Sequence, residues 1–456
     1  MTRLDDWRAS GREVSVAGLA RSGTAAARLL SARGIPVYVS DSGATPVLDA
    51  AADALRVALG DMVSVDIAGH DLARVCRGAA LILSPGIAPE AGVVRAAVGA
   101  GVPVLAEAQL GLDAMAGVPS VIVTGTNGKT TTTAMVDHLL RTAGRHGVAA
   151  GNIGTPLSAV AMAEPLPEWL AVELSSFQLH DCPDLAPTVG ILTNLAPDHL
   201  DRYPTLAAYY ADKGRLFSNA RATSIWVSNL DDVDSRAMAA NVVGRHLAFS
   251  IAAGARADAW YDRAADQLML AGEPLLARGR LPLLGDHNVA NALAASLALH
   301  ATGVGHAALA EGLATFRPLR HRMEPVREVE GVWWINDSKA TNVASTRVAI
   351  QAMTRPFVLL LGGRHKGEPY LDLVGPLCEY GVAVVAYGEA GDLIEQDLGP
   401  AIRVVRGSTF EDVINKARVL APDGGAVLLS PACSSYDMFD NYEQRGATFR
   451  SLVEAM

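Results

Sequence analysis

The sequence predicts an α/β fold made of three α/β domains. The first observation is that short apolar runs, rich in β-branched residues, end in Gly, Ser, Asp or Asn. The second is that a stretch compatible with a helix follows each run. Such runs fit parallel strands that are buried on both faces, because crossover helices cover a parallel sheet. The length of 456 residues allows roughly two to four domains.

The expected strands fall into three groups along the chain. They are Val14–Leu19, Pro36–Ser40, Leu81–Ser84, Val121–Thr124, Leu170–Glu173, Val189–Asn194, Phe357–Leu361, Val382–Tyr387 and Ala426–Ser430. Short β-runs such as Gln267–Leu270 indicate a meander on the second group, and an Ala-rich helix, Val289–His300, closes that group. The segment 316–319 has the composition of a linker. We therefore expect domains at residues 1–107, 108–318 and 319–456.

Composition restricts the class of protein. Half of the residues are hydrophobic and 19% are charged, which favours a folded globular chain over disorder. The net charge of −10 argues against a partner of double-stranded nucleic acid. The cysteines show no spacing typical of a metal site, the first ten residues do not resemble a signal peptide, and no uncharged apolar stretch reaches the ~20 residues of a membrane span. We expect a cytoplasmic monomer with reduced thiols and no membrane span.

A glycine-rich turn lies between the strand at Val121–Thr124 and a helix that continues from Thr131. It reads Gly125, Thr126, Asn127, Gly128, Lys129, Thr130. Such a turn aims backbone N–H groups at an anion at the helix N-terminus. Lys129 would contact the β- and γ-phosphates of ATP, and the Thr130 hydroxyl would coordinate Mg²⁺. Val123 stands where the general phosphate-loop pattern has its first glycine, so this is a shorter form of the motif.

Polar side chains follow the next strands of the same group. Glu173 ends one strand, where a carboxylate can hold Mg²⁺ beside the phosphate loop. Asn194 ends another strand and leads into a polar cluster with Asp198 and His199. An isolated histidine is more often a core or capping residue, but this cluster lies where α/β proteins collect ligands.

These segments resemble the Mur ligase family. The resemblance rests on T-G-T-N-G-K-T at 124–130, E-L-S-S-F-Q at 173–178 and N-x-x-x-D-H-x-D-R-Y at 194–203. The runs at 334–342 and 430–446 resemble more particularly the members that add D-glutamate to UDP-N-acetylmuramoyl-L-alanine. The resemblance covers the whole chain. It implies Rossmann-like first and third domains around a central domain like that of phosphate-loop NTPases.

The resemblance also implies a reaction in which ATP converts a substrate carboxylate to an acyl phosphate, which an amine then attacks. Its catalytic residues would be Lys129, His199, Lys213 and Arg322. Two Mg²⁺ ions would be held by Thr130, Glu173, His199 and Lys213, the lysine as a carbamate formed with CO₂. The other residues expected at the nucleotide are Thr131, Asn288, Asn291, Asp337 and Lys339.

The substrates are implied in the same way. The UDP-substrate would contact Ser22, Asp41, Ser42, Ser84, Pro85, Gly86, Asn152, Ser175 and Gln178, and D-glutamate would contact Thr341, Lys366, Ser435, Tyr436 and Tyr442. The chain departs from the best-known members at Tyr436, where they have Leu, and at Tyr442, where they have Phe. It also has Arg364 and His365 where small or acidic residues are expected.

Several alternatives remain at this point. Other members of the family add L-alanine, a diamino acid or D-Ala-D-Ala, and folylpolyglutamate synthase is a related ligase. A kinase-type or regulatory nucleotide-binding protein is a different class, and so is an NAD-dependent oxidoreductase. The turn at Gly18–Gly23 approximates a dinucleotide-binding motif, but Ala20 replaces its middle glycine.

Overall fold

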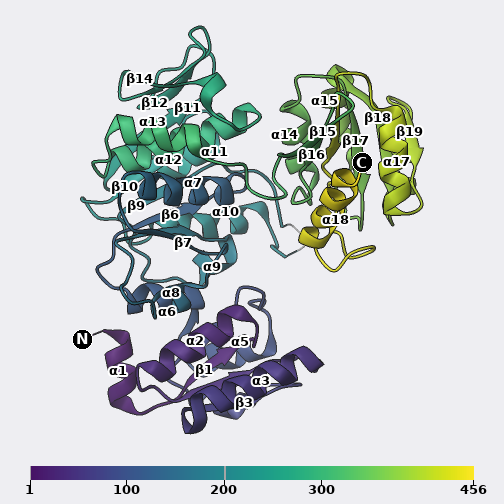
Figure 1. Cartoon of the computed structure of the whole chain (residues 1–456). Coiled ribbons are helices and arrows are strands. Elements are labelled where there is room, and N and C mark those ends of the chain that lie inside the picture. Colours follow the sequence, from purple (N-terminus) through teal and green to yellow (C-terminus); the bar gives the residue numbers. More distant parts are fainter. Residues whose placement is uncertain (1, 200–201) are drawn as a thin grey trace. The chain divides into compact units, whose positions relative to one another are not determined.

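The computed structural model describes residues 2–199 and 202–456, and within them the chain forms three sheets of five, nine and six strands. Helices alternate with the strands in all three (Figure 1), so the predicted α/β class with three domains is confirmed. The chain divides into two compact units. The first is Met1–Ala277 with Asn291–Leu313, and the second is Arg278–Ala290 with Ala314–Met456.

The first sheet is entirely parallel, with the strand order β3-β2-β1-β4-β5. Its strands are β1 (Val14–Ala17), β2 (Val37–Ser40), β3 (Val63–Asp66), β4 (Leu81–Leu83) and β5 (Val104–Ala106). The helices of this part are α1 (Arg3–Ser10), α2 (Arg21–Ala32), α3 (Pro46–Leu59), α4 (Leu72–Val75) and α5 (Gly92–Gly99). β1, β2 and β4 are buried along their whole length, as expected for central parallel strands.

The second sheet has the order β14-β13-β12-β11-β10-β9-β6-β8-β7. Its strands are β6 (Ser120–Thr124), β7 (Gly147–Gly151), β8 (Trp169–Glu173), β9 (Val189–Leu192), β10 (Ile225–Asn229), β11 (Arg245–Ser250), β12 (Ala259–Asp262), β13 (Gln267–Leu270) and β14 (Glu273–Ala277). The strands from β7 to β12 are parallel, and β13 and β14 continue the sheet antiparallel. The meander predicted around β13 is therefore confirmed.

The helices of this central part follow the strands in the chain. They are α6 (Glu107–Ala114), α7 (Lys129–Thr142), α8 (Leu157–Val160), α9 (Ser176–His180), α10 (Leu206–Gly214), α11 (Val233–Ala239), α12 (Asp286–His300) and α13 (His306–Thr315). α7 packs on β6, β7 and β8 (Figure 1). Because β6, β8 and β9 are adjacent parallel strands, their carboxyl ends meet at one edge of the sheet.

The third sheet has the order β15-β16-β20-β17-β18-β19. Its strands are β15 (Glu324–Val329), β16 (Val332–Asn336), β17 (Phe357–Gly362), β18 (Gly381–Tyr387), β19 (Val404–Arg406) and β20 (Ala426–Leu429), and its helices are α14 (Val343–Gln351), α15 (Val374–Tyr380), α16 (Gly391–Leu398), α17 (Phe410–Leu420) and α18 (Tyr442–Glu454). β15 is an antiparallel edge strand, in contrast to the parallel strands beside it. Its end residues, Glu324 and Val329, are buried, while the four residues between them are exposed or partly exposed, as expected for an edge strand that meets solvent.

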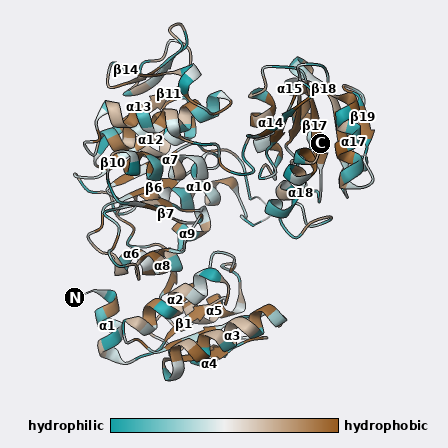
Figure 2. Cartoon of the chain, viewed as in Figure 1, coloured by the Kyte–Doolittle hydropathy of each residue, from teal (hydrophilic) through white to brown (hydrophobic). Residues whose placement is uncertain are grey.

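Each unit has hydrophobic cores of its own. Figure 2 shows that the strands are predominantly hydrophobic, while hydrophilic residues lie mainly on the helices and loops. In the second unit, Leu359 and Leu428 pack on one face of the sheet, and Val358 and Phe449 on the other. No helix among the described residues is long and apolar enough to cross a membrane.

Candidate active site

The phosphate loop connects β6 to α7 and contains two glycines with positive φ, Gly125 at 140° and Gly128 at 83°. A Cβ on Gly125 would lie 2.0 Å from Thr193 Oγ1, and one on Gly128 would lie 2.4 Å from Asn291 Oδ1. The backbone conformation and the close neighbours both restrict these positions to glycine. The loop thereby leads into α7 with the helix N-terminus open to an anion.

Thr193 and Asn194, which follow β9, stabilise the phosphate loop by hydrogen bonds. The Thr126 backbone N–H donates to Asn194 O over 2.9 Å, and the Asn127 N–H donates to Asn194 Oδ1 over 3.0 Å. Thr193 Oγ1 donates to Asn127 O over 2.6 Å. Asn194, which the sequence identifies as a polar strand end, therefore holds the phosphate loop in shape.

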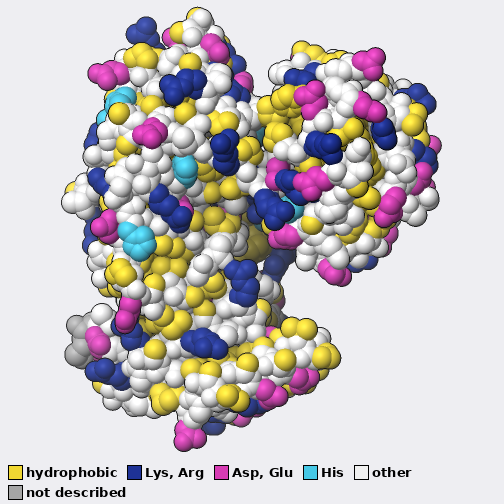
Figure 3. All heavy atoms as spheres, in the orientation of Figure 1, with side chains coloured by type: hydrophobic (Ala, Val, Ile, Leu, Met, Phe, Trp, Pro, Cys, Tyr) yellow, Lys and Arg dark blue, Asp and Glu magenta, His cyan; other side chains and the backbone are white. Residues whose placement is uncertain are grey.

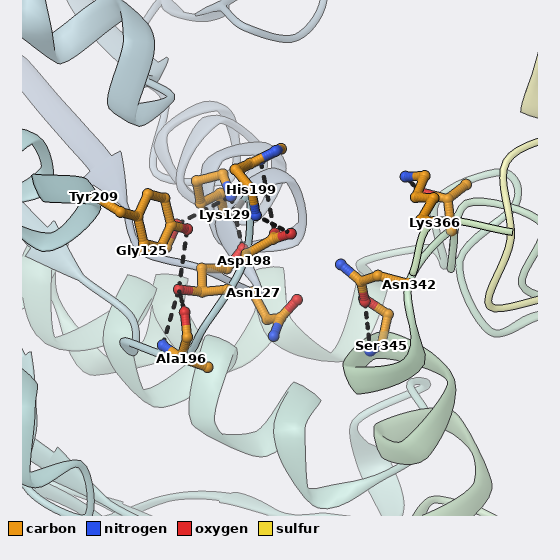
Figure 4. A network of polar contacts seen from close by, with 12 residues as sticks. Gly125, Asn127, Lys129, Ala196, Asp198, His199, Tyr209, Asn342, Ser345 and Lys366 are labelled. Atoms are coloured by element: carbon orange, nitrogen blue, oxygen red, sulfur yellow. Dashed lines mark hydrogen bonds and ion pairs between the residues drawn. The ribbon is translucent and has the colours of Figure 1, made fainter. Parts of the chain in front are cut away.

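Lys129 lies at the start of α7 and folds back over the loop (Figure 4). Its Nζ donates to Gly125 O over 3.0 Å and to Thr126 O over 2.7 Å. Thr130 and Thr131 follow in the same helical turn and are buried. The cation and the two hydroxyls expected at the nucleotide are thus gathered at one helix terminus.

Glu173 ends β8, directly beside β6 in the sheet. It is buried, and its Oε1 accepts a hydrogen bond from Asn152 Nδ2 over 3.0 Å. Its Oε2 is also buried and has no hydrogen-bond partner among the described residues. A buried carboxylate oxygen without a donor fits a hard cation such as Mg²⁺. A cluster of three His, Cys, Asp or Glu side chains that could hold a metal is not present in the described part of the chain, so hydroxyl and phosphate oxygens would have to complete this site.

Lys213 lies on α10 with only 1% of its surface exposed. Its Nζ donates to Gly125 O over 2.6 Å and lies 4.7 Å from the centre of the Tyr209 ring. Burial, with the positive charge of Lys129 nearby, holds the pKa of Lys213 well below its usual value. A lysine with a lowered pKa is partly a neutral amine, which is the form that reacts with CO₂.

His199 lies after β9 in a left-handed backbone conformation, with φ at 54°. Its ring meets Phe177 edge-on at 5.3 Å and Tyr209 at 6.0 Å, and its Nε2 is 3.7 Å from Asp198 Oδ2 (Figure 4). Leu200 and Asp201 of the same motif lie outside the described residues. Of these two aromatic neighbours, Phe177 lies on α9 and Tyr209 on α10, and neither was predicted from the sequence to flank His199.

The residues expected at the UDP-substrate lie in the same unit. Asp41 accepts hydrogen bonds from the backbone N–H groups of Leu19 and Gly43, each over 2.8 Å, so it holds the turn that precedes Ser22. Ser84 lies on the other side of this turn, where its Oγ donates to Gly18 O over 3.4 Å. The remaining expected residues of this sheet edge are Ser42, Pro85 and Gly86, which follow β2 and β4.

Ser175 and Gln178 form a capping box at the start of α9. Gln178 N–H donates to Ser175 Oγ over 3.2 Å, and Ser175 N–H donates to Gln178 Oε1 over 3.0 Å. Both residues thus have a structural role that the sequence analysis did not anticipate. The Nε2 of Gln178 is buried and has no hydrogen-bond partner among the described residues.

Asn288, Arg322, Asp337 and Lys339 lie in the second unit, whereas Asn291 lies in the first. Asp337 accepts from Met323 N–H over 3.1 Å and from Ser430 Oγ over 2.9 Å. Burial raises its pKa to about 7, although both hydrogen bonds act in the opposite direction.

The residues expected at D-glutamate surround the carboxyl edge of the third sheet. Lys366 Nζ lies 3.5 Å from Thr341 Oγ1, so the structure brings these two together (Figure 4). Ser435 is buried, Tyr436 is 65% exposed, and Tyr442 begins α18. Tyr442 also lies beside Lys339, whose Nζ is 5.3 Å from the ring centre.

Two further arginines belong to this edge and were not identified as site residues from the sequence. Arg445 is completely buried and donates to Ser338 O over 2.9 Å and to Cys433 O over 3.2 Å. Arg364, one of the departures from the family pattern, makes two hydrogen bonds of 3.0 Å to Glu389. It therefore supports the loop that carries Lys366.

Three families of domains match the chain. The N-terminal domain of MurD-like Mur ligases matches residues 12–106, the Mur ligase middle domain matches 123–299, and the Mur ligase glutamate ligase domain matches 321–433.

Relatives match over nearly the full length. UDP-N-acetylmuramoylalanine–D-glutamate ligase of Salinibacter ruber is 38% identical, with 97% of each chain covered. The ligase of the same name from Myxococcus xanthus is also 38% identical, with 98% of this chain and 99% of the relative covered. Among solved structures, UDP-N-acetylmuramate–alanine ligase of Thermotoga maritima shares the fold at a TM-score of 0.62 and 18% identity, covering 97% of this chain and 99% of that one. The chain belongs to the Mur ligase family.

Proposed function

We propose that this protein uses ATP and Mg²⁺ to join D-glutamate to UDP-N-acetylmuramoyl-L-alanine, a step of peptidoglycan synthesis. The products are UDP-N-acetylmuramoyl-L-alanyl-D-glutamate, ADP and phosphate. The observation that carries this proposal is the shorter phosphate loop beside a buried Glu173 oxygen that has no hydrogen-bond partner among the described residues, in a chain whose full-length relatives bear that name. The γ-phosphate of ATP activates the alanyl carboxylate as an acyl phosphate, and the D-glutamate amine then attacks it through a tetrahedral intermediate.

The reaction must bring the anionic phosphates of ATP close to an anionic substrate carboxylate, and the residues of the phosphate loop reduce the repulsion between them. Lys129 and the N-terminus of α7 bind the anionic phosphates, where a fixed cation stabilises the charge that develops during transfer. Arg322, Asn288, Asn291, Asp337 and Lys339 complete the nucleotide site in this proposal. Their contribution is to orient ATP, because acyl transfer needs its reacting atoms held in line.

Two Mg²⁺ ions are part of the proposal. Thr130 and Glu173 would hold one, and His199 and Lys213, as a carbamate, would hold the other. Bound Mg²⁺ supplies neutralising charge between phosphate and carboxylate oxygens. The lowered pKa of Lys213 supports the carbamate, because a neutral amine reacts with CO₂ and the product carries the oxygen anion that a hard cation prefers.

The proposed substrate sites lie at the carboxyl ends of strands in the three sheets. Ser22, Asp41, Ser42, Ser84, Pro85 and Gly86 would bind the uridine diphosphate, and Asn152, Ser175 and Gln178 would bind the acyl arm. The unpaired Gln178 Nε2 supports this assignment. Thr341, Lys366, Ser435, Tyr436 and Tyr442 would bind D-glutamate, whose two carboxylates require cations and hydroxyl donors.

The proposal includes a cytoplasmic location, a monomeric state and domains at residues 1–107, 108–318 and 319–456. A soluble nucleotide-linked substrate and ATP are consistent with the cytoplasm. The three sheets lie within these three ranges, which supports the boundaries.

Release of phosphate from ATP by the purified protein tests the proposed reaction. We expect release only when UDP-N-acetylmuramoyl-L-alanine and D-glutamate are both present, with the dipeptide product detected by mass spectrometry. Parallel reactions with L-alanine, a diamino acid, D-Ala-D-Ala or L-glutamate serve as controls. Phosphate release that is indifferent to D-glutamate would contradict the proposal.

A further inference from the structure

Asp212 lies on α10 directly before Lys213 and is 9% exposed. Its Oδ1 accepts hydrogen bonds from His180 Nδ1 over 2.8 Å and from Arg215 Nε over 3.0 Å. Its Oδ2 accepts from the Tyr203 hydroxyl over 3.0 Å. His180 ends α9, and Tyr203 belongs to the segment that follows His199. One carboxylate therefore joins three separate parts of the central domain.

The contact with Tyr203 links Asp212 to His199. The Tyr203 backbone N–H donates to His199 O over 3.0 Å. The Tyr203 ring stacks on Phe177, with ring centres 5.2 Å apart, and lies 5.3 Å from the ring of Tyr209. Phe177 and Tyr209 are the two rings that flank the His199 imidazole. The aromatic cluster in which His199 lies is thus held by the Tyr203 hydroxyl at Asp212 and by the Tyr209 hydroxyl at Thr126 Oγ1, 3.2 Å away.

The helix links Asp212 to Lys213. Neighbouring side chains on a helix point about 100° apart, so the direction of one fixes the direction of the next. Asp212 points to α9 and Tyr203, while Lys213 points to the phosphate loop, where its Nζ meets Gly125 O. The hydrogen bonds of Asp212 therefore set the rotation of α10 about its own axis.

We propose that Asp212 is a positioning residue, which holds His199 and Lys213 in the relative places that the reaction requires. The inference rests on the proposed function, since it gives both residues a role at the acyl phosphate. Asp212 acts through Tyr203 and through its own helix and does not touch the substrates. A carboxylate that merely packs two helices together would leave turnover unchanged while the fold is intact.

Steady-state kinetics of Asp212→Asn and Tyr203→Phe test the proposal. Tyr203→Phe keeps the ring and removes only the hydroxyl, and Asp212→Asn keeps the shape and removes the charge. We expect kcat to fall by about 10-fold or more in Asp212→Asn, as for other residues that orient ligands. We expect the KM values for ATP and D-glutamate to change by less than about twofold, because binding of these substrates does not depend on Asp212.

The chain offers a matched control. The Tyr261 hydroxyl donates to Asp266 Oδ1 over 2.6 Å in the β12–β13 hairpin, and Tyr261→Phe removes the same kind of contact there. If Tyr203 acts through Asp212, the double variant Tyr203→Phe/Asp212→Asn should lose little more activity than Asp212→Asn alone. Circular dichroism and the thermal midpoint establish that each variant is folded at the assay temperature.

A second measurement does not need turnover. ¹³C NMR of protein equilibrated with ¹³C-bicarbonate should show a carbamate signal that Lys213→Ala abolishes, and Asp212→Asn should weaken that signal. The inference is overturned if folded Asp212→Asn keeps the kcat and the carbamate signal of the wild type, or loses no more than Tyr261→Phe does. Failure of the proposed function would appear differently, as wild-type protein that releases no phosphate in response to D-glutamate.

Discussion

At the scale of single residues, the candidate site contains ionisable side chains that are buried, and burial changes the pKa of Lys213. Lys213 is almost completely buried, yet its Nζ has a carbonyl oxygen and an aromatic ring as neighbours instead of a carboxylate. Burial of this kind disfavours the ammonium form of Lys213 relative to the neutral amine. The Glu173 Oε2 is also buried, and it has no hydrogen-bond partner among the residues that the structure describes.

Replacement of Lys213 by Ala should abolish most of the ligase activity, because the carbamate oxygens cannot be formed. Added bicarbonate should not restore it. Phosphate release measured with and without bicarbonate checks this expectation. Lys416→Ala is the matched control, since Lys416 is a helix lysine that pairs with Asp412. Near-native turnover of the Lys213→Ala variant would show that the carbamate assignment is wrong.

Glu173→Gln should raise the Mg²⁺ concentration needed for half-maximal activity and lower activity by roughly 10- to 100-fold. The amide keeps the acceptor for Asn152 but loses the charge that a hard cation prefers. Titration of activity with Mg²⁺ measures the effect. The control is Glu168→Gln near the other end of β8, where the carboxylate accepts from His146 N–H and is exposed. An unchanged Mg²⁺ requirement in Glu173→Gln would exclude Glu173 as a ligand.

Asp337 should make stability depend on pH. Burial raises its folded-state pKa to about 7 from the usual 3.8, so the folded state binds the proton more tightly than the unfolded chain. The resulting stability is present at low pH and is lost as the pH rises towards about 7. The amide side chain of the Asp337→Asn variant does not ionise. The difference between the thermal midpoints of the variant and the wild type should therefore shift in favour of the variant as the pH rises from about 4 to about 7. The exposed Asp61→Asn variant is the control, and a gain independent of pH would contradict this explanation.

At the scale of elements, the phosphate loop contains glycines with positive φ that are packed closely against Thr193 and Asn291. Gly128→Ala should lower both stability and nucleotide affinity, because a Cβ at this position would lie 2.4 Å from Asn291 Oδ1. The positive φ alone costs roughly 1–2 kcal/mol. Gly144→Ala is the matched control, since Gly144 has a φ of 74° but no atom within 4 Å of the added Cβ. Urea unfolding and calorimetric titration with Mg-ADP should show a larger loss in Gly128→Ala, and equal losses would contradict the role of the contact.

The elements also show how far the sequence could predict the fold. The runs around Val121, Val189 and Phe357 are apolar throughout, so their burial in parallel sheets was predictable from composition alone. The edge strand β15 was not predictable in this way. The segment from Glu324 to Val329 has the composition of a loop, and it forms a strand by pairing with β16. Its pairing partner is decided by tertiary structure and not by local propensity.

The candidate site divides in the same way. Lys129 and Thr130 follow β6, and Glu173 ends the adjacent parallel strand β8, so the rule that ligands collect at strand ends was enough to predict a shared sheet edge for them. The rings of Phe177 and Tyr209 flank His199, and an aromatic residue carries no local signal of its neighbours. Arg445 was not predicted as a site residue, yet it donates to the carbonyl oxygens of Gly362, Cys433 and Ser338, which end or follow three strands. Sequence alone could not show which helix face would be buried there.

At the scale of the whole molecule, the charge of the surface favours separate chains. The net charge is −10 at pH 7, and acidic and basic side chains are interspersed on the surfaces shown in Figure 3. Among the described residues, the three most exposed large apolar side chains are Val57 and Val47 on α3 and Val419 on α17. Scattered exposed apolar residues are ordinary on protein surfaces.

The protein should therefore sediment as a monomer near neutral pH over a range of concentrations, because like charges oppose association. Near its isoelectric point of 5.6 this repulsion vanishes, and we expect association or reduced solubility there. Sedimentation velocity at both pH values, each with and without added salt, measures how far charge repulsion controls association. Salt should promote association near pH 7 if repulsion keeps the chains apart, since it screens surface charge. A stable dimer at neutral pH that persists on dilution would contradict the prediction and would indicate an interface built from specific contacts.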